Sequence, residues 1–166
     1  MQRTICKIHR PEEIATVSEL ARQIWTEHYV PIIGEEQVEY MLDEFQSPEA
    51  IRAQLASGYN YYLLEVDSEP VGYLALVPEP EDNRLMISKI YIKKSCRGAG
   101  HGGHLMEFAR ERSRELEVSQ IWLRVNRHND SAVNWYKEQG FSIDKKDKKN
   151  IGRGFYMDDF IMSACL

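Results

Sequence analysis

The residues with the clearest chemical potential form a glycine-rich run that follows an apolar segment in the middle of the chain. The run Arg97–Gly103 (RGAGHGG) comes after the strand-like segment Leu85–Lys93, and a helical pattern of apolar residues begins within it. Glycine allows positive φ and lets a ligand lie against the backbone. The N-terminus of a helix adds unpaired N–H groups and a partial positive charge. Together these features predict a site for an anion such as a pyrophosphate.

The same run also satisfies the dinucleotide-binding pattern G-x-G-x-x-G. A lone match is weak evidence unless repeated parallel βαβ units surround it. More than half of the chain precedes the run, and the next strand-like segment, Gln120–Asn126, ends without the acid that would bind a ribose. These two features argue against a nicotinamide dehydrogenase. It is kept as an alternative that a nucleotide titration would test. The pattern G-x-x-x-x-G-K-[ST] does not occur, which excludes a P-loop.

Two blocks of sequence, in order, resemble the GNAT superfamily of N-acetyltransferases. In the first, Ile90-Tyr91-Ile92 is followed after four residues by Arg97–Gly102, which is similar to the acyl-coenzyme A signature R/Q-x-x-G-x-G/A. The second block is Asn126-x-x-Asn129-x-x-Ala132-x-x-Trp135-Tyr136-x-x-x-Gly140-Phe141. The resemblance covers the chain from about Tyr59 to Phe141.

The resemblance implies an enzyme that uses acetyl-coenzyme A as cosubstrate. It would move the acetyl group to a primary amine by direct attack in a ternary complex. The resemblance also implies that the backbone of one strand binds the pantetheine arm as an added strand would. The residues expected to bind the cofactor are Ile90, Tyr91, Ile92, Arg97, Gly98, Ala99, Gly100, His101, Gly102, Gly103 and Asn129. For Asn129, helix capping is an alternative role that is compatible with cofactor binding.

An amine that attacks a thioester needs a deprotonated nitrogen, stabilisation of the oxyanion and a proton for the departing thiolate. Tyr136 stands where the family has the acid, and a core tyrosine beside Trp135 is the alternative. A backbone N–H near Ile92 is the expected oxyanion donor. The neighbourhood where the family often has a carboxylate base holds Ser88 and Lys89 here. The candidate bases, acting directly or through water, are Glu27, Glu39, Tyr29 and Tyr40.

The acceptor side is expected in the early helices, which carry six acids and no base between Glu35 and Glu49. The chain also resembles the polyamine-acetylating branch of the family in the stretches Trp25–Phe45 and Lys89–Ile92. We therefore expect a polyamine or another small cationic amine, with acceptor-side residues Trp25, Tyr29, Glu39, Tyr40 and Asp43. The alternatives are a solvated acidic helix face, acetylation of a protein N-terminus or lysine, and a coenzyme A-binding regulator without turnover.

Length and composition predict one globular domain, residues 1–166, with 43% hydrophobic and 28% charged residues. The formal net charge of −5 argues against nucleic-acid binding. Because no apolar run is long enough for a membrane span or a signal peptide, we expect a cytoplasmic protein with no membrane partner. The three cysteines indicate a reducing compartment, and no metal-ligand spacing is present, so we expect no metal. The expected assembly is a monomer or a homodimer.

The predicted fold is α/β, with a mixed, mostly antiparallel central sheet flanked by helices and with one parallel strand pair that splays apart, as in the family. Hydrophobic periodicity predicts strands at Thr4–Ile8, Tyr59–Val66, Val71–Val77, Arg84–Lys93, Gln120–Asn126, Phe141–Lys145 and Phe155–Ala164. Helices are expected from Pro11 to Trp25, over Glu35–Phe45, after Ser47, over Ala99–Leu116 and after Asn129.

Several local expectations depend on single residues. Pro31 and Gly34 should interrupt the helical pattern in Trp25–Gly34. The basic segment Lys145–Arg153 is expected to be a solvated hairpin tip, with screening of the charged end of coenzyme A as the alternative. Cys96 is expected to be a small buried filler, with a reactive thiol as the alternative, and Leu116 should point into the core. His101 and His104 are expected to face solvent.

Overall fold

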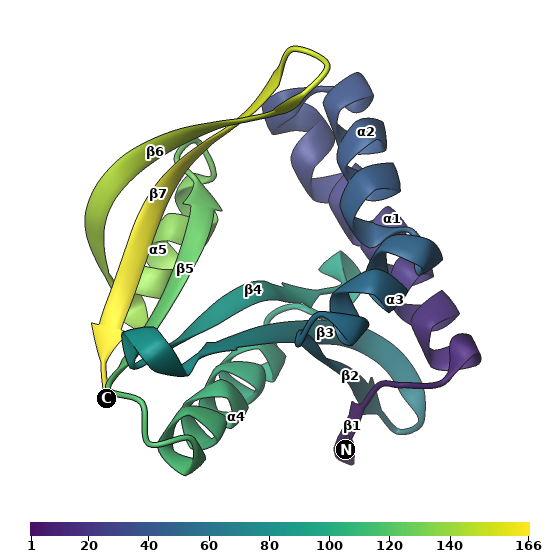
Figure 1. The fold of residues 1–166 in the computed structure, drawn as a ribbon. Helices are drawn as coiled ribbons and strands as arrows, with labels where there is room; N and C mark the ends of the chain where they lie inside the picture. Colours follow the sequence, from purple (N-terminus) through teal and green to yellow (C-terminus); the bar gives the residue numbers. More distant parts are fainter. The chain divides into compact units, whose positions relative to one another are not determined.

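The computed structural model describes all 166 residues, Met1–Leu166. Its strands and helices follow one another along the chain as shown in Figure 1. Their bounds are β1 Arg3–Lys7, α1 Pro11–Ile33, α2 Glu35–Gln46, α3 Pro48–Ala56, β2 Asn60–Val66, β3 Glu69–Glu79, β4 Arg84–Ile92, α4 His101–Glu115, β5 Gln120–Asn126, α5 Asp130–Glu138, β6 Ser142–Gly152 and β7 Phe155–Cys165.

The seven strands are hydrogen-bonded in the order β1-β2-β3-β4-β5-β7-β6. The pair β4 and β5 is parallel, whereas β1–β2, β2–β3, β5–β7 and β6–β7 are antiparallel. The parallel register joins Arg84–Ile87 to Gln120–Leu123 and ends there, although β4 continues to Ile92 and β5 to Asn126. The predicted mixed, mostly antiparallel α/β fold is therefore confirmed.

The chain divides into two compact units, each made of two segments. Unit 1 contains Met1–Val77 and Lys89–Ala109, and unit 2 contains Pro78–Ser88 and Arg110–Leu166. Strands β3 and β4 and helix α4 each contribute to both units, because the three boundaries fall within them. The glycine-rich run belongs to unit 1.

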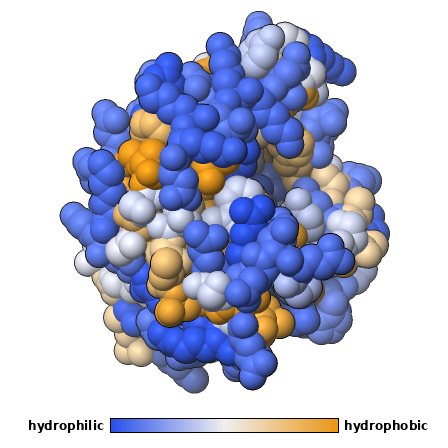
Figure 2. Space-filling view, turned by 60° about the vertical axis from the view of Figure 1, so that its left-hand side comes forward, coloured by the Kyte–Doolittle hydropathy of each residue, from blue (hydrophilic) through white to orange (hydrophobic).

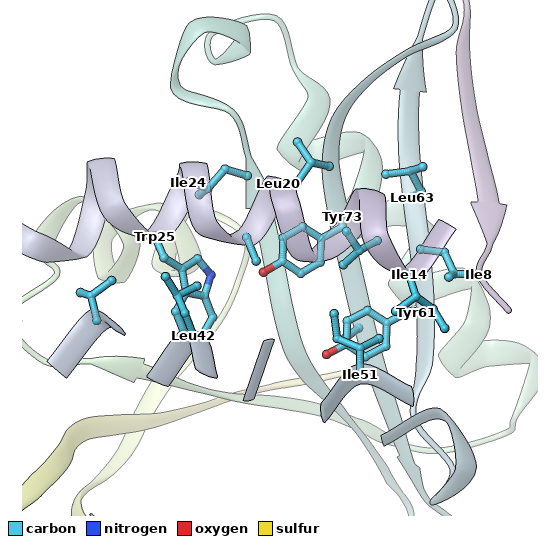
Figure 3. Packing of buried hydrophobic residues seen from close by; sticks show 14 residues of the cluster. Ile8, Ile14, Leu20, Ile24, Trp25, Leu42, Ile51, Tyr61, Leu63 and Tyr73 are labelled. Carbon is cyan, nitrogen blue, oxygen red and sulfur yellow. The ribbon is translucent and has the colours of Figure 1, made fainter. Parts of the chain in front are cut away.

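In unit 1, helices α1–α3 cover one face of β2 and β3, and the first part of α4 covers the other (Figure 1). Two successive residues of β2 mark the two faces. Tyr61 is fully buried in the cluster under α1–α3, whereas Tyr62 packs its ring edge-on against Phe108 of α4, with centroids 4.8 Å apart. Figure 3 shows this cluster, which joins side chains of α1, α2 and α3 to those of β2 and β3. Each large apolar side chain buried there stabilises the fold by roughly 1.5–3 kcal/mol.

A chain of buried polar groups crosses this core and holds α2 and α3 against the strands. The Tyr73 hydroxyl donates to Gln46 Oε1 at 2.7 Å, and Gln46 Nε2 donates to the Tyr61 hydroxyl at 3.0 Å. The Tyr61 hydroxyl in turn donates to Gln54 Oε1 at 2.5 Å. Burial raises the pKa of both phenols, so they stay protonated and keep donating. This chain satisfies polar atoms that would otherwise be costly to bury.

The prediction that Pro31 and Gly34 interrupt the helix in Trp25–Gly34 is wrong for most of that stretch, because α1 continues to Ile33. Pro31 lies two residues from the helix end. Tyr29, Val30 and Ile33 pack against the core, and this packing compensates for the hydrogen bond that Pro31 cannot make. Gly34 ends the helix, with φ 87° and its N–H donating to Val30 O at 2.9 Å.

The basic segment Lys145–Arg153 is not a hairpin tip. Strand β6 extends to Gly152 and pairs with β7, so that only Arg153 and Gly154 form the turn, both with positive φ. Strand β6 is held by its backbone pairing with β7 and by contacts of single side chains. Lys148 lies opposite Asp158 in the register, but its Nζ lies over the Tyr156 ring, 4.8 Å from the centroid, and the Asp158 carboxylate pairs with Arg127 at 2.8 Å. Asp147 of β6 pairs with Arg124 of β5 at 2.6 Å.

Two side chains differ from expectation in their burial, and several turns and caps agree with it. Leu116 lies just beyond α4 and is 48% exposed, so it is not a core residue. Cys96 is half-buried in a short 3-10 turn, Lys94–Cys96, rather than fully buried.

The predicted cap of α3 is confirmed, since Ser47 Oγ accepts from Ala50 N at 3.1 Å. The β2–β3 hairpin is also confirmed.

The face of the molecule in Figure 2 is largely hydrophilic, with hydrophobic residues in small separate patches. The large hydrophobic residues that are exposed are Met1, Leu116, Ile143, Tyr156 and Leu166. None of the helices combines the length and the apolar composition needed to cross a bilayer.

Candidate functional site

The first part of the glycine-rich run, Arg97–Gly100, forms an exposed loop between β4 and α4 in unit 1, and the rest begins α4. Gly98 has φ 85° and Gly100 has φ 81°, a backbone conformation that favours glycine. Gly102 and Gly103 lie in the first turn of α4 and do not share it. The loop is anchored to the strand by Arg97, whose Nε donates to Ile92 O at 3.2 Å. The glycines therefore shape two parts of the loop, its turn and the start of the helix.

The backbone N–H groups of this loop are available to a ligand. No N–H from Gly98 to Gly103 donates to an acceptor of the chain, and the first intrahelical bond is made by His104 N, which donates to Gly100 O at 3.1 Å. Three of these donors are the unpaired first-turn groups that every α-helix has. A side chain at Gly98 or Gly103 would meet open space, because no heavy atom lies within 4 Å of the Cβ position. This combination fits an anion with several oxygens.

Arg3 of β1 holds the loop from outside the motif. Its Nη2 donates to Ala99 O at 2.6 Å, and its Nε donates to His101 Nδ1 at 3.1 Å. Arg3 was not among the expected site residues, because Ala99 and His101 lie 96 and 98 positions from it and meet it only through tertiary structure. A single arginine in an edge strand carries no local signal that could have revealed this role.

The expectation that His101 faces solvent is wrong. His101 is 6% exposed at the start of α4, and its Nδ1 is occupied as a hydrogen-bond acceptor. Burial, then the nearby Arg3 charge and His104, lower the pKa of His101 below its ordinary value. A neutral ring that accepts at Nδ1 carries its proton on Nε2. His104 is half-buried.

The end of β4 lies tightly against β3 in unit 1. Lys93 N donates to Val71 O at 2.8 Å. The next residue of β3 is Gly72, where an added Cβ would overlap the carbonyl oxygen of Tyr91 and lie 2.6 Å from Ile92 Cδ1. Glycine is therefore required at this position. The backbone of Ile90–Ile92, which is the expected partner of the pantetheine arm, is held by this close packing.

Two of the expected acceptor-side residues meet Tyr91 in an aromatic cluster. The hydroxyls of Tyr29 and Tyr91 lie 3.1 Å apart, and either one can be the donor. Trp25 packs edge-on against both rings, with centroid distances of 5.8 and 5.7 Å. Trp25 is 2% exposed, so it supports the two tyrosines from the core and has no surface for a substrate. Tyr29 and Tyr91 are half-buried.

The acids of α2 form an exposed face. Glu36, Glu39 and Asp43 are all exposed, and Tyr40 beside them is half-buried. Arg22 of α1 pairs with Glu39 at 3.0 Å, and both side chains are 53% exposed. Such exposed pairs contribute little to stability. Glu39 is thus paired with Arg22 of the same chain, whereas the carboxylates of Glu36 and Asp43 face solvent.

In unit 2, Asn129 caps α5 as predicted. Its Oδ1 accepts from Ala132 N at 3.4 Å and from Ser131 Oγ at 3.3 Å. Asn129 is 4% exposed, and its Nδ2 makes no hydrogen bond within the chain. The capping role therefore uses only the oxygen and leaves the amide nitrogen for a ligand.

Tyr136 lies on α5 and is half-buried. Its ring packs edge-on against Trp135 and Phe141, with centroid distances of 5.3 and 5.9 Å. The structure thus brings Asn129 and Tyr136 together on one short helix of unit 2. The loop residues Arg97–Gly103, Ile90–Ile92 and Tyr29 come together in unit 1.

The sequence and the fold are similar to those of several known proteins. The sequence model described as "Acetyltransferase (GNAT) family" matches residues 17–141, well over half of the chain. An "Uncharacterized N-acetyltransferase in pepI 3'region" of Lactobacillus delbrueckii subsp. lactis is 32% identical over 139 residues, which cover 80% of this chain and 78% of that protein. The "Spermidine N(1)-acetyltransferase" of Thermoplasma acidophilum is 25% identical over 152 residues, covering 89% of this chain and 91% of that protein.

Among solved structures, the PaiA N-acetyltransferase of Thermoplasma acidophilum, in complex with coenzyme A, is similar in fold. The TM-score is 0.85 at 23% identity, and the similarity covers 100% of both chains. A sequence model that spans both of the blocks described above, a relative that is 32% identical and the shared fold all agree. The chain belongs to the GNAT family of N-acetyltransferases.

Proposed function

We propose that this enzyme transfers the acetyl group of acetyl-coenzyme A to a primary amine by direct attack in a ternary complex. The observation that carries the proposal is the run of backbone N–H groups from Gly98 to Gly103 that have no acceptor in the chain. Unpaired donors at a helix N-terminus are suited to the pyrophosphate of coenzyme A. The solved neighbour with coenzyme A supports the same choice of ligand.

The rest of the cofactor would be held by residues that lie on either side of this loop in the sequence. The backbone of Ile90, Tyr91 and Ile92 would pair with the pantetheine arm as an added strand does. The parallel register that ends at Ile87 supports this role, since β4 continues for five residues beyond it. The free Nδ2 of Asn129 would donate a further hydrogen bond.

In the reaction, a bond forms between the amine nitrogen and the acyl carbon, and the carbon–sulfur bond breaks. Tyr136 would give its phenolic proton to the departing thiolate and regain a proton from solvent. A phenol has a pKa of about 10 and a thiol one of about 8.5, so this donation is modestly uphill and needs only close placement. A backbone N–H near Ile92 would stabilise the oxyanion. The proton of the attacking amine would leave through Tyr29 or through water to solvent.

The proposed acceptor is a small polyamine or another compact cationic amine. The similarity to the spermidine N(1)-acetyltransferase over 89% of this chain supports this substrate class. The solvent-facing carboxylates of Glu36 and Asp43 on α2 would attract a distal ammonium group, while Glu39 already pairs with Arg22. Tyr29 and Tyr40 would complete this side of the acceptor site.

Two measurements, made one after the other, test the proposal. Calorimetric titration with coenzyme A tests cofactor binding, and NADH serves as the competing nucleotide. Release of free thiol from acetyl-coenzyme A is then followed over a panel of diamines, polyamines, monoamines, amino acids and peptides. Binding of coenzyme A with turnover on the polyamines is the expected result. Binding without turnover on any amine would make the chain a regulator, and binding of NADH alone would reject the cofactor assignment.

A further inference from the structure

We propose that Arg3 is a positioning residue for the phosphate site: it fixes the glycine-rich loop and adds its own charge to the phosphate groups of coenzyme A. This inference rests on the proposed function of the loop in cofactor binding. It concerns a residue of β1, far outside both sequence blocks of the family, that contacts the loop at two points.

The two contacts use the fork of one guanidinium group. Nη2 binds the carbonyl of Ala99 at 2.6 Å, and Nε binds Nδ1 of His101 at 3.1 Å. Ala99 precedes the helix and His101 is its first residue. Arg3 therefore joins the loop to the helix start and fixes their relative orientation, which an arginine can do because its donors lie in one rigid plane.

The loop needs such a constraint because its own backbone makes few hydrogen bonds. Gly98, Ala99 and Gly100 are exposed, and no N–H of these residues has an acceptor in the chain. Glycine loses more conformational freedom on ordering than any other residue. The supporting strand is well held, since all five residues of β1 pair with β2 in a continuous register from Arg3–Val66 to Lys7–Tyr62. A loop fixed to this strand is ordered before the ligand arrives, and preorganisation of this kind increases affinity.

The same geometry places a positive charge at the anion site. No carboxylate pairs with Arg3, and its hydrogen bonds go to two neutral acceptors, the Ala99 carbonyl and the His101 ring. Its Nη2 lies 3.4 Å from the position that a Cβ on Gly100 would occupy, which puts the guanidinium beside the turn of the loop. A cation without a counter-ion next to a row of free N–H groups is suited to a phosphate.

The first experiment compares two variants of the same strand. Arg3→Met and Lys7→Met each remove one cation from β1, but Lys7 is exposed and lies at the opposite end of the strand, beside Tyr62. Calorimetric titration should show that Arg3→Met raises the Kd for coenzyme A about tenfold or more, as expected for lost hydrogen bonds to a charged group. Lys7→Met should bind within about twofold of the native protein. Equal Kd values for the two variants would overturn the inference.

A second measurement separates the phosphate site from general damage to the fold. S-acetylpantetheine carries the thioester but lacks the phosphate groups, so it does not use the loop. Arg3→Met should lower kcat/KM for acetyl-coenzyme A about tenfold and leave kcat/KM for S-acetylpantetheine nearly unchanged. A parallel loss with both substrates would overturn the assignment of Arg3 to the phosphate site.

A third measurement tests the coupling through His101. In His101→Phe the acceptor at Nδ1 is lost, whereas His101→Asn retains an oxygen close to that position. We expect His101→Asn to bind coenzyme A more tightly than His101→Phe. The double variant Arg3→Met with His101→Phe should lose less binding free energy than the sum of the losses in the two single variants. Arg3→Lys keeps the charge but not the fork. Native affinity of Arg3→Lys would overturn the positioning role.

These outcomes also separate the inference from the proposed function. If the native protein does not bind coenzyme A, the proposed function fails before any Arg3 variant is considered. If the native protein binds it and Arg3→Met does so equally well, the proposed function stands and only the role of Arg3 is rejected.

Discussion

The hydroxyl of Tyr29 on α1 lies 3.1 Å from the hydroxyl of Tyr91 on β4. These residues are 62 positions apart in the chain, and the two rings meet edge-on with centroids 6.2 Å apart. Tyr91 belongs to the strand expected to bind the pantetheine arm, and Tyr29 to the helix expected to face the acceptor. The hydrogen bond therefore connects the two halves of the proposed ternary complex within unit 1.

Removal of either hydroxyl should affect the amine more than the cofactor. Tyr29→Phe and Tyr91→Phe should each lower kcat/KM for the amine by roughly threefold to tenfold, the range of one lost hydrogen bond. Because the two hydroxyls bind each other, the double variant should lose less than the product of the single effects. Steady-state kinetics in both substrates measure this. A rise in the Kd for coenzyme A without any change in the amine parameters would contradict the assignment.

Gly100 should be essential for cofactor binding for reasons beyond backbone strain. Gly100→Val places a branched side chain at φ 81°, and Gly154→Val does the same at φ 79° in the β6–β7 turn. Both changes should cost stability by about 1–2 kcal/mol, because the left-handed region disfavours side chains. Only Gly100→Val should abolish binding of coenzyme A in a calorimetric titration. Native affinity in Gly100→Val would show that the phosphates bind elsewhere.

Tyr136→Phe isolates the proposed acid. It should leave the Kd for coenzyme A near native and lower kcat by roughly tenfold to a thousandfold, the range for one proton-transfer group. The cost in stability should be small, since the ring keeps its contacts with Trp135 and Phe141. The measurement is single-turnover kinetics over a pH series. If the rate constant of the chemical step were the same as in the native protein across that pH series, Tyr136 would be a packing residue and not the acid.

The acids of α2 should discriminate between diamines and monoamines. Asp43→Asn should raise KM for a diamine more than KM for a monoamine of equal length, and added salt should have the same effect by screening. Glu39→Gln should act in the same direction but less strongly, because Glu39 pairs with Arg22. Glu49 is an exposed acid on α3, and Glu49→Gln is the matched control. Equal effects on both amines would identify these acids as an ordinary solvated face.

The start of α1 should lose stability in acid. Glu13 accepts the N–H groups of Arg10 at 2.9 Å and His9 at 3.2 Å, and these bonds, with the Arg10 side chain, lower its pKa from 4.5 to about 2. Since the folded state binds the proton less tightly than the unfolded state, the contribution is complete above pH 4.5 and is lost as pH falls toward about 2.

Glu13→Ala should therefore lower the free energy of unfolding at pH 7 by about 1 kcal/mol, as for other helix caps. The difference from the native protein should shrink between pH 4.5 and about 2. Urea unfolding at a series of pH values measures it. Glu12→Ala is the control, because Glu12 is the neighbouring acid and makes no such backbone bonds. A difference that is independent of pH would rule out the carboxylate as its source.

The sequence by itself determined the features that arise from short spacings. The glycine run after Ile92, the cap at Asn129 and the hairpin β2–β3 each depend on residues within one element or one turn, and local backbone preferences decide them. The two blocks of family resemblance also lie in such segments. For this reason the fold class and the position of the glycine-rich loop between β4 and α4 could be predicted.

Only the tertiary structure decided which distant side chains support those segments. Pro31 was expected to interrupt α1, but the helix continues to Ile33 because Tyr29 and Ile33 pack against the core. The basic segment forms a strand because its backbone pairs with β7, from Lys145 opposite Ile161 to Asn150 opposite Tyr156. Arg3 reached the loop, and Tyr29 reached Tyr91, across more than 60 positions of chain. Contacts of this kind depend on the whole sheet and its covering helices, and no spacing in the sequence records them.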